Sequence, residues 1–225
     1  MKLDEKLAVL NRIYGVFDDF AGKLDVACRM YCAQCCTRNV TLTTLETYII
    51  VDYLHSNNKL HLFDNLRTAL SKKRFQPSIT TNQLADFCIR GENPPEEEPA
   101  SPTGKCPLLQ NDECPIYPVR PFGCRCFVSR RPCKENGYAD IDPFVVTVNN
   151  VFLQYIEHVD VRGCSGNLTD MLLFMESREN IIHYYKNDSL PPNSPLVQNR
   201  PMPALMIPPE HRTRIQQILE AIQGK

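Results

Sequence analysis

Four of the eleven cysteines lie within one nine-residue stretch, Cys28-Arg29-Met30-Tyr31-Cys32-Ala33-Gln34-Cys35-Cys36. A free cysteine normally behaves as a small apolar residue within a core, so this density needs another explanation. Thiolates bind zinc and iron–sulfur clusters, and metal ligation is therefore the first interpretation to test. We expect the rest of the fold to be arranged around this stretch.

A second group of cysteines occurs later in the chain. Residues 106–133 contain five cysteines and five prolines and show little periodicity, so we expect irregular structure whose shape is imposed by what its thiolates bind. The simplest interpretation is that the two groups meet in the fold and hold a metal centre. The cysteines of this second group are Cys106, Cys114, Cys124, Cys126 and Cys133.

The composition is that of an ordinary globular protein with little net charge. Of the 225 residues 43% are hydrophobic, and 25 basic residues nearly balance 26 acidic ones, which gives a net charge of -1. This balance argues against nucleic acid or a membrane surface as a partner. The charged N-terminus does not resemble a secretion signal, and no apolar run approaches the ~18 residues of a membrane span.

These features predict a cytoplasmic protein. The reducing cytoplasm keeps thiols free, so clustered cysteines there bind metal or perform redox chemistry more often than they form structural disulfides. The partners we expect are a metal ion or cluster and a protein partner or substrate, with no nucleic acid and no membrane.

Apolar residues at three- and four-residue intervals predict that much of the chain is helical. Thr43-Thr44-Leu45-Glu46 has the form of a capping box, and Asp142-Pro143 has the form of an N-cap followed by a first turn, so a helix is expected to begin at each. Prolines and like charges predict an exposed, mobile loop at 91–99, and prolines predict an extended segment at 191–209. The expected helices are 3–24, 44–57, 60–75, 81–89, 143–158, 168–186 and 210–222.

No segment shows credible strand alternation, so we expect a mainly α fold. It would be a helical domain with an irregular cysteine-rich segment organised by a metal or iron–sulfur centre. The chain is expected to be a single domain over residues 1–225. Within it, residues 24–134 would form the cysteine-cluster metal-binding core, and residues 140–225 would form a C-terminal helical and proline-rich extension.

Several motifs, in order, resemble the YkgJ-like cysteine-cluster family, whose members carry a zinc- or iron-chelating domain. The resemblance covers roughly residues 24 to 130 and implies metal or cluster binding without implying an activity. A similar cysteine pattern in flagellin lysine methylases is associated with an iron–sulfur cluster. The matching motifs are Cys28-x3-Cys32-x2-Cys35-Cys36, Thr41-Leu42-Thr43 with Glu46, Cys106-Pro107-Leu108-Leu109, Cys114-Pro115-Ile116-Tyr117, and Arg120-Pro121-x2-Cys124-Arg125.

The candidate metal ligands come from both groups. Cys133 and Cys164 would each complete a site or be small buried residues, and Cys88 is expected to be an ordinary residue of its helix. Arg120 and Arg125 would place positive charge beside the thiolates and favour their deprotonated form. No catalytic residue is identified. The ligands we predict are Cys28, Cys32, Cys35, Cys36, Cys106, Cys114, Cys124 and Cys126.

The spacing favours an iron–sulfur cluster over zinc. Structural zinc sites usually have two Cys-x2-Cys pairs, and only Cys32 and Cys35 have that spacing. A 4Fe-4S cluster is commonly bound by a compact run of cysteines and one remote cysteine, which this chain offers. Radical S-adenosylmethionine enzymes also use the Cys28-x3-Cys32-x2-Cys35 spacing, but the strands and helices of their barrel are missing here.

Three functions follow from these alternatives. The preferred one is a metal-binding protein with an iron–sulfur cluster in a structural or electron-transfer role. The others are a zinc-binding interaction module and a cluster-containing, protein-modifying enzyme related to flagellin lysine methylases. Whether the protein is an enzyme stays open at this stage.

Overall fold

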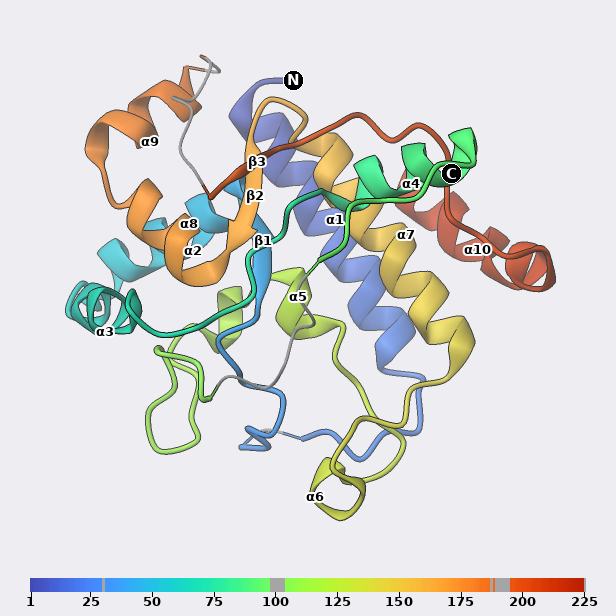
Figure 1. Ribbon diagram of the computed structural model, residues 1–225, viewed down its shortest axis with the longest axis horizontal. Coiled ribbons are helices and arrows are strands. Elements are labelled where there is room, and N and C mark those ends of the chain that lie inside the picture. The colour runs from blue at the N-terminus through green and yellow to red at the C-terminus, as the bar shows by residue number, and fades with distance from the viewer. Residues whose placement is uncertain (30, 98–103, 187, 189–194, 225) are drawn as a thin grey trace.

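The computed structural model describes residues 1–29, 31–97, 104–186, 188 and 195–224, and its helices confirm the predicted mainly α fold (Figure 1). None of the described helices combines the length and the apolarity needed to cross a membrane. The elements are α1 (Leu3–Ala21), β1 (Thr41–Thr43), α2 (Thr44–Ser56), α3 (Leu62–Ala69), α4 (Thr81–Arg90), a 3-10 turn (Tyr117–Val119), α5 (Phe122–Arg125), α6 (Cys133–Asn136), α7 (Pro143–Val159), β2 (Cys164–Asn167), α8 (Leu168–Met175), α9 (Arg178–Tyr185), β3 (Val197–Gln198), a 3-10 turn (Pro209–His211) and α10 (Arg212–Gln223).

The centre of the fold is formed by α1 and α7, which lie side by side in Figure 1. The Phe17 ring of α1 meets the Phe152 ring of α7 at a centroid distance of 5.3 Å. Phe122 of α5 completes this aromatic group, because it stacks on Phe152 at 5.5 Å and meets Phe17 edge-on at 4.7 Å. Such aromatic packing fixes the short helix α5, in the middle of the cysteine-rich segment, to the main core.

The helices near the C-terminus share this core with those near the N-terminus. Buried residues of α7, α8 and α10 belong to the same hydrophobic cluster as those of α1 and α2. Asn82 of α4 donates a hydrogen bond to the Arg200 carbonyl (3.0 Å), and Gln154 of α7 donates one to the Ala204 carbonyl (2.7 Å). These bonds hold residues 199–207 along α4 and α7, as expected of an extended segment that wraps the surface. Residues 191–194 of the predicted extended segment lie outside the described residues.

Three short strands correct the expectation that the chain has no strands. β1, β2 and β3 form an antiparallel sheet in that order, with Thr41 opposite Asn167 and Cys164 opposite Gln198. The longest strand has four residues, which is too short for alternation to be visible in a sequence. β1 follows the first cysteine group and leads directly into α2. The sheet therefore fixes the point at which the chain passes from the cysteine group into the helical core.

Two predicted helices are shorter or broken in the structure. The helix expected at 60–75 is α3, which ends at Ala69, and Arg74 beyond it donates to the Asp170 carboxylate at 2.8 Å and to the Leu70 carbonyl at 2.6 Å. The helix expected at 168–186 is divided into α8 and α9, because Ser177 between them is extended and is the N-cap residue of α9. At Arg74 a contact with a distant part of the chain outweighs helix propensity.

The predicted loop at 91–99 is described only as far as residue 97. Its residues 92–97 are exposed, as expected. However, the Glu97 carboxylate accepts hydrogen bonds from the Ser78 backbone N–H (2.8 Å) and hydroxyl (3.0 Å). The end of this segment therefore has a defined partner, which the sequence analysis did not anticipate.

Asp160, at the end of α7, joins four parts of the fold. Its buried carboxylate accepts hydrogen bonds from Lys6 of α1 (3.3 Å), the Leu45 backbone N–H of α2 (2.9 Å) and the Tyr184 hydroxyl of α9 (2.5 Å). Asn199 also donates to the Asp160 carbonyl at 2.9 Å. Buried polar groups with this many partners hold packed elements in one arrangement.

Asp160 also predicts a pH dependence of stability. Burial, only partly opposed by Lys6, raises the pKa of this carboxyl group from 3.8 to about 6. The folded state thus keeps a proton that the unfolded state has released, so the stabilisation is present below pH 3.8 and is lost as the pH rises through about 6. We expect the free energy of unfolding of metal-free wild type, relative to Asp160→Asn, to fall by up to ~3 kcal/mol over this window. Urea titrations of both proteins across the window test this, and a difference that rises with pH would contradict it.

Candidate metal centre

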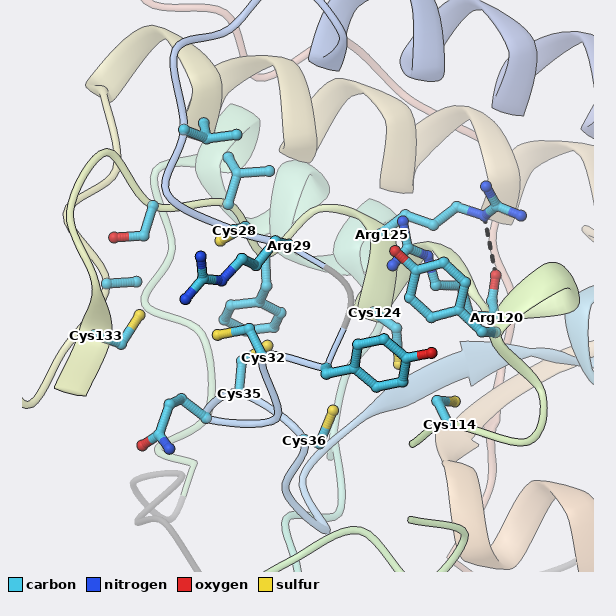
Figure 2. Close-up of a pocket in the computed structure, with 18 of the residues that line it drawn as sticks. Cys28, Arg29, Cys32, Cys35, Cys36, Cys114, Arg120, Cys124, Arg125 and Cys133 are labelled. Carbon is cyan, nitrogen blue, oxygen red and sulfur yellow. Dashed lines mark hydrogen bonds between the residues drawn. The ribbon is translucent and has the colours of Figure 1, made fainter. Parts of the chain in front are cut away.

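Cysteines from both groups line one cavity of about 360 Å³ (Figure 2). The structure therefore brings together two segments that are far apart in the sequence. A cavity wall that carries several thiols suits soft metals and iron–sulfur clusters. The cysteines that line the cavity are Cys28, Cys32, Cys35 and Cys36 of the first group and Cys114, Cys124 and Cys133 of the second.

Backbone hydrogen bonds join the two segments beside these cysteines. The Ala27 N–H donates to the Ser129 carbonyl at 2.8 Å, and the Cys106 N–H donates to the Cys36 carbonyl at 2.9 Å. The Arg38 N–H also donates to the Gly104 carbonyl at 3.2 Å. Both ends of the first cysteine stretch are thus fixed against the second cysteine segment.

Glu46 connects the core to the cysteine-rich segment. The predicted capping box is confirmed, since the Glu46 carboxylate accepts from the Thr43 N–H at 2.9 Å at the start of α2. The same buried carboxylate accepts from the Tyr14 hydroxyl at 2.8 Å and from the Phe122 N–H at 2.7 Å. One side chain therefore links α1, α2 and α5. The capping pattern gave no indication of these two tertiary contacts.

Gly123, between Phe122 and Cys124, is required by close packing of α5 on β1. A Cβ atom at this position would lie 2.7 Å from the Thr41 carbonyl oxygen, which belongs to the backbone and cannot move aside cheaply. The absence of a side chain at 123 thus lets α5 approach β1 closely, and Cys124 and Cys126 are placed by that approach.

Gly123→Ala is expected to lower the free energy of unfolding by ~1–3 kcal/mol, because α5 has to move away from β1. Gly15→Ala in α1 is the control, since nothing lies within 4 Å of its added Cβ and alanine favours helix. Chemical denaturation of the two variants measures the difference. Equal stabilities would mean that α5 does not depend on this approach.

Cys106 and Cys126 do not line the cavity, although both lie beside Cys124. The pKa of Cys124 is raised by burial and, further, by the nearby thiols. Burial raises the pKa of Cys106 to about 11 and that of Cys126 to about 12. The Cys126 thiol donates to the Gly123 carbonyl at 3.7 Å, which directs it toward the backbone of α5. Of the predicted ligands, these two are the ones that the structure places outside the cavity wall.

The remaining cysteines differ in their surroundings. Cys164 is buried in β2, where its sulfur lies 3.3 Å from the Thr44 hydroxyl, and burial raises its pKa to about 11. Cys88 is exposed on α4. Neither lines the cavity, whereas Cys133 does. The structure therefore separates Cys133 from Cys164, for which the sequence left the same two alternatives open.

Positive charge lies beside the Cys114 side of the cavity. Burial raises the pKa of the Cys114 thiol, and the nearby charges of Arg120 and Lys59 oppose that rise. Arg120 packs over the Tyr117 ring at 4.1 Å, whereas Lys59 donates to the Pro115 carbonyl at 2.8 Å. Cations in these positions stabilise thiolates and offset the charge of a thiolate-bound centre.

Arg125 also makes contacts that its position in the sequence does not predict. Its guanidinium lies over the Tyr14 ring at 4.3 Å and forms an ion pair with Asp18 at 3.3 Å. It also donates to the Arg120 carbonyl at 3.0 Å. Arg125 thus links α5 and the turn before it to α1, in addition to lining the cavity.

The thiols face a common space without forming a closed coordination sphere. Across the described parts of the chain, no three Cys, His, Asp or Glu side chains are close enough to hold a metal ion as they stand. Cysteine side chains change position by rotation about a single χ1 torsion. Metal binding at this cavity therefore requires side-chain rotation and small movements of the two segments.

A comparison with protein families gives a match to the cysteine-rich part of the chain. The model named CxxCxxCC, described as "Putative zinc- or iron-chelating domain", matches residues 27–144. This range contains both cysteine groups, Glu46 and α5, and it ends at the beginning of α7. Neither the curated proteins nor the solved structures include a match.

Proposed function

Because this chain belongs to the CxxCxxCC family of zinc- or iron-chelating domains, we propose that it binds metal through the thiolates of its two cysteine groups. The observation that supports this function best is the convergence of seven thiols from both groups on one cavity. All eleven cysteines are free, so none of the thiols is withdrawn from ligation by a disulfide.

The donor set fits a thiolate-bound metal. Sulfur ligands prefer zinc, copper(I) and iron–sulfur clusters to hard cations such as magnesium. Arg120 and Lys59 lie beside Cys114, where they offset the negative charge that deprotonated ligands bring. The residues proposed to hold the metal are the predicted ligands that line the cavity, with Cys106 next to Cys124 as a further candidate.

An iron–sulfur cluster, with 4Fe-4S preferred, is the form of metal that we propose. A single zinc ion needs four sulfurs at ~2.3 Å from one point, whereas a cluster distributes its thiolates over several iron atoms. The spread of the thiols around the cavity, with no ready site for one ion among the described residues, favours the larger group. The cluster would supply structural stabilisation or electron transfer, and zinc is the alternative metal.

Purification without oxygen tests the proposed function. A brown protein that absorbs near ~400 nm and contains iron and sulfide would support a cluster. A colourless protein with stoichiometric zinc would support the alternative metal. Protein that contains neither metal, and that takes up neither when zinc or iron with sulfide is supplied, would overturn the proposal.

A further inference from the structure

Exposed aromatic side chains gather where the cavity meets solvent. Three of them both line the cavity and are exposed, Tyr31 at 64%, Phe127 at 48% and Tyr117 at 37%, and these three are called the cavity opening below. A fourth, Tyr138, is exposed in the loop that follows α6. Among the described residues, Tyr185 of α9 is the one other aromatic residue with comparable exposure. Exposed aromatic surface is thus concentrated beside the cysteines.

This concentration indicates a surface that another molecule covers. Elsewhere the large aromatic residues are packed inside, as Phe17, Phe122 and Phe152 of the main core show. Apolar groups that gather on an exposed surface commonly mark sites of interaction. Tyr and Phe, together with Arg, are enriched in protein–protein interfaces.

An arginine without a partner lies at the cavity opening. Arg29 is exposed and lines the cavity, and within the described part of the chain its guanidinium has no hydrogen bond or ion pair. In contrast, Arg125 pairs with Asp18 and Arg120 packs over Tyr117. Figure 2 shows Arg29 on the opposite side of the view from Arg120. The N–H donors of Arg29 therefore remain available to a group from outside this chain.

The cysteine-rich segments also carry a surplus of positive charge. Of the 25 basic and 26 acidic residues in the chain, nine basic and five acidic ones lie in residues 23–38 and 104–140, so the rest of the chain is net acidic. A metal centre reduces this surplus without cancelling it, since four thiolates and one divalent ion bring a net charge of about −2. The region around the cavity opening therefore attracts anionic groups when metal is bound.

We propose that the cavity opening docks an acidic segment of another protein, which places a carboxylate against Arg29 and an apolar side chain against Tyr31 and Phe127. This inference rests on the proposed function, because it gives the metal centre of the same cavity a protein partner. Arginine binds a carboxylate through two parallel N–H···O bonds, so Arg29 would orient the segment as well as attract it.

The cavity gives the docked segment a recess for an anchoring side chain. Its volume of about 360 Å³ lies in the range of pockets that bury a whole ligand group. Val26, Leu109 and Val128 form apolar parts of its wall, and none of the three belongs to the main hydrophobic core. These side chains supply no metal ligand, so they are available to an apolar anchor of the partner. Anchors that fill such pockets contribute most of the affinity of many interfaces.

A protein segment fits this surface better than a nucleic acid, although aromatic residues and arginines bind both. Asp18, Asp112 and Glu113 also line the cavity, among the aromatic residues. A polynucleotide carries a phosphate at every nucleotide and would be repelled by these carboxylates. A protein segment matches a surface of mixed charge residue by residue, which favours it as the partner.

Selection from a library of short random peptides on metal-loaded wild type tests the inference. The selected peptides are expected to be enriched in Asp and Glu together with an apolar or aromatic residue. Enrichment in Lys and Arg, or no enrichment over the same selection on Phe127→Ala, would overturn it. A single-stranded oligonucleotide that binds more tightly than the selected peptides would overturn the choice of a protein partner.

Variants at the cavity opening measure its contribution to the affinity for a selected peptide, read by fluorescence anisotropy. Phe127→Ala and Tyr31→Ala are each expected to weaken binding by ~10-fold or more. Arg29→Gln is expected to weaken binding and also to reduce its dependence on salt, because a charge-assisted contact is lost. Tyr185→Ala on α9 is the matched control, since Tyr185 is exposed to 63% but does not line the cavity. Equal affinities of Phe127→Ala and Tyr185→Ala would overturn the inference.

A measurement on wild type alone covers the case in which a variant fails to fold. A selected peptide that carries a photo-reactive group is expected to cross-link to Tyr31 or Phe127 of metal-loaded wild type. Cross-links confined to α9 or to other distant surfaces would overturn the inference while leaving the proposed function intact. Metal-loaded wild type that selects no acidic peptide has the same meaning, whereas wild type that takes up neither zinc nor iron with sulfide would overturn both.

Discussion

Cys124→Ser is expected to abolish metal binding at the cavity that Cys124 lines and to remove the stabilisation that the metal gives. Cys124 is the thiol whose neighbours include Cys106 and Cys114, and it lies in α5, which Phe122 fixes to the core. A ligand bound only by the folded state at ~1,000 times its Kd stabilises that state by ~4 kcal/mol. Structural metal sites therefore couple metal loss to a loss of stability.

The expected result is a difference that depends on metal. Wild type loaded with metal should lose ~4 kcal/mol of unfolding free energy on chelation, whereas Cys124→Ser should show almost no change. Without metal, the two proteins should differ by less than ~1.5 kcal/mol, since serine and cysteine have similar volumes. Thermal unfolding with and without chelator, combined with metal analysis, measures all four states.

Cys88→Ser is the matched control for this experiment. Cys88 is exposed on α4 and does not line the cavity, so the same chemical change should leave metal content and stability unaffected. Retention of metal and of metal-dependent stability by Cys124→Ser would remove Cys124 from the ligand set. An equal effect of both variants would indicate a general sensitivity to thiol loss.

The parts of the fold that could be predicted are those fixed by local sequence. The capping residues Thr43 and Glu46 and the N-cap Asp142 gave the starts of α2 and α7, because capping depends on residues within one turn. The N-cap bond from the Phe144 N–H to the Asp142 carboxylate is present at 2.8 Å. Likewise, the density of cysteines indicated where the cavity would be.

The parts that could not be predicted depend on contacts between distant segments. Nothing near Phe122 in the sequence shows that its N–H meets Glu46 or that its ring stacks on Phe152. Nothing near Cys133 distinguishes it from Cys126, yet the backbone bond between Ala27 and Ser129 brings the loop of Cys133 to the cavity. Such contacts arise from the topology of the whole chain, and periodicity within a window does not contain them.

Glu46→Ala is expected to produce the largest loss of stability among the variants that leave every cysteine in place. The Glu46 carboxylate accepts from the Thr43 N–H, the Tyr14 hydroxyl and the Phe122 N–H, at 2.9, 2.8 and 2.7 Å. A buried donor left without a partner costs ~1–3 kcal/mol, so three donors predict a loss of ~3–9 kcal/mol in the free energy of unfolding. The Phe122 N–H opens α5, so metal retention should fall as well.

Glu5→Ala provides a matched control, because Glu5 occupies the same position in the capping box of α1. Its carboxylate accepts from the Lys2 N–H at 2.9 Å and is exposed, with no bond to another part of the fold among those described. Its loss should cost ~1 kcal/mol and leave metal content unchanged. Glu46→Gln, which keeps one acceptor oxygen, should fall between the two alanine variants. Equal losses for Glu5→Ala and Glu46→Ala would show that Glu46 acts only as a cap, and the link from the helical core to α5 would then have to lie in the stacking of Phe122 alone.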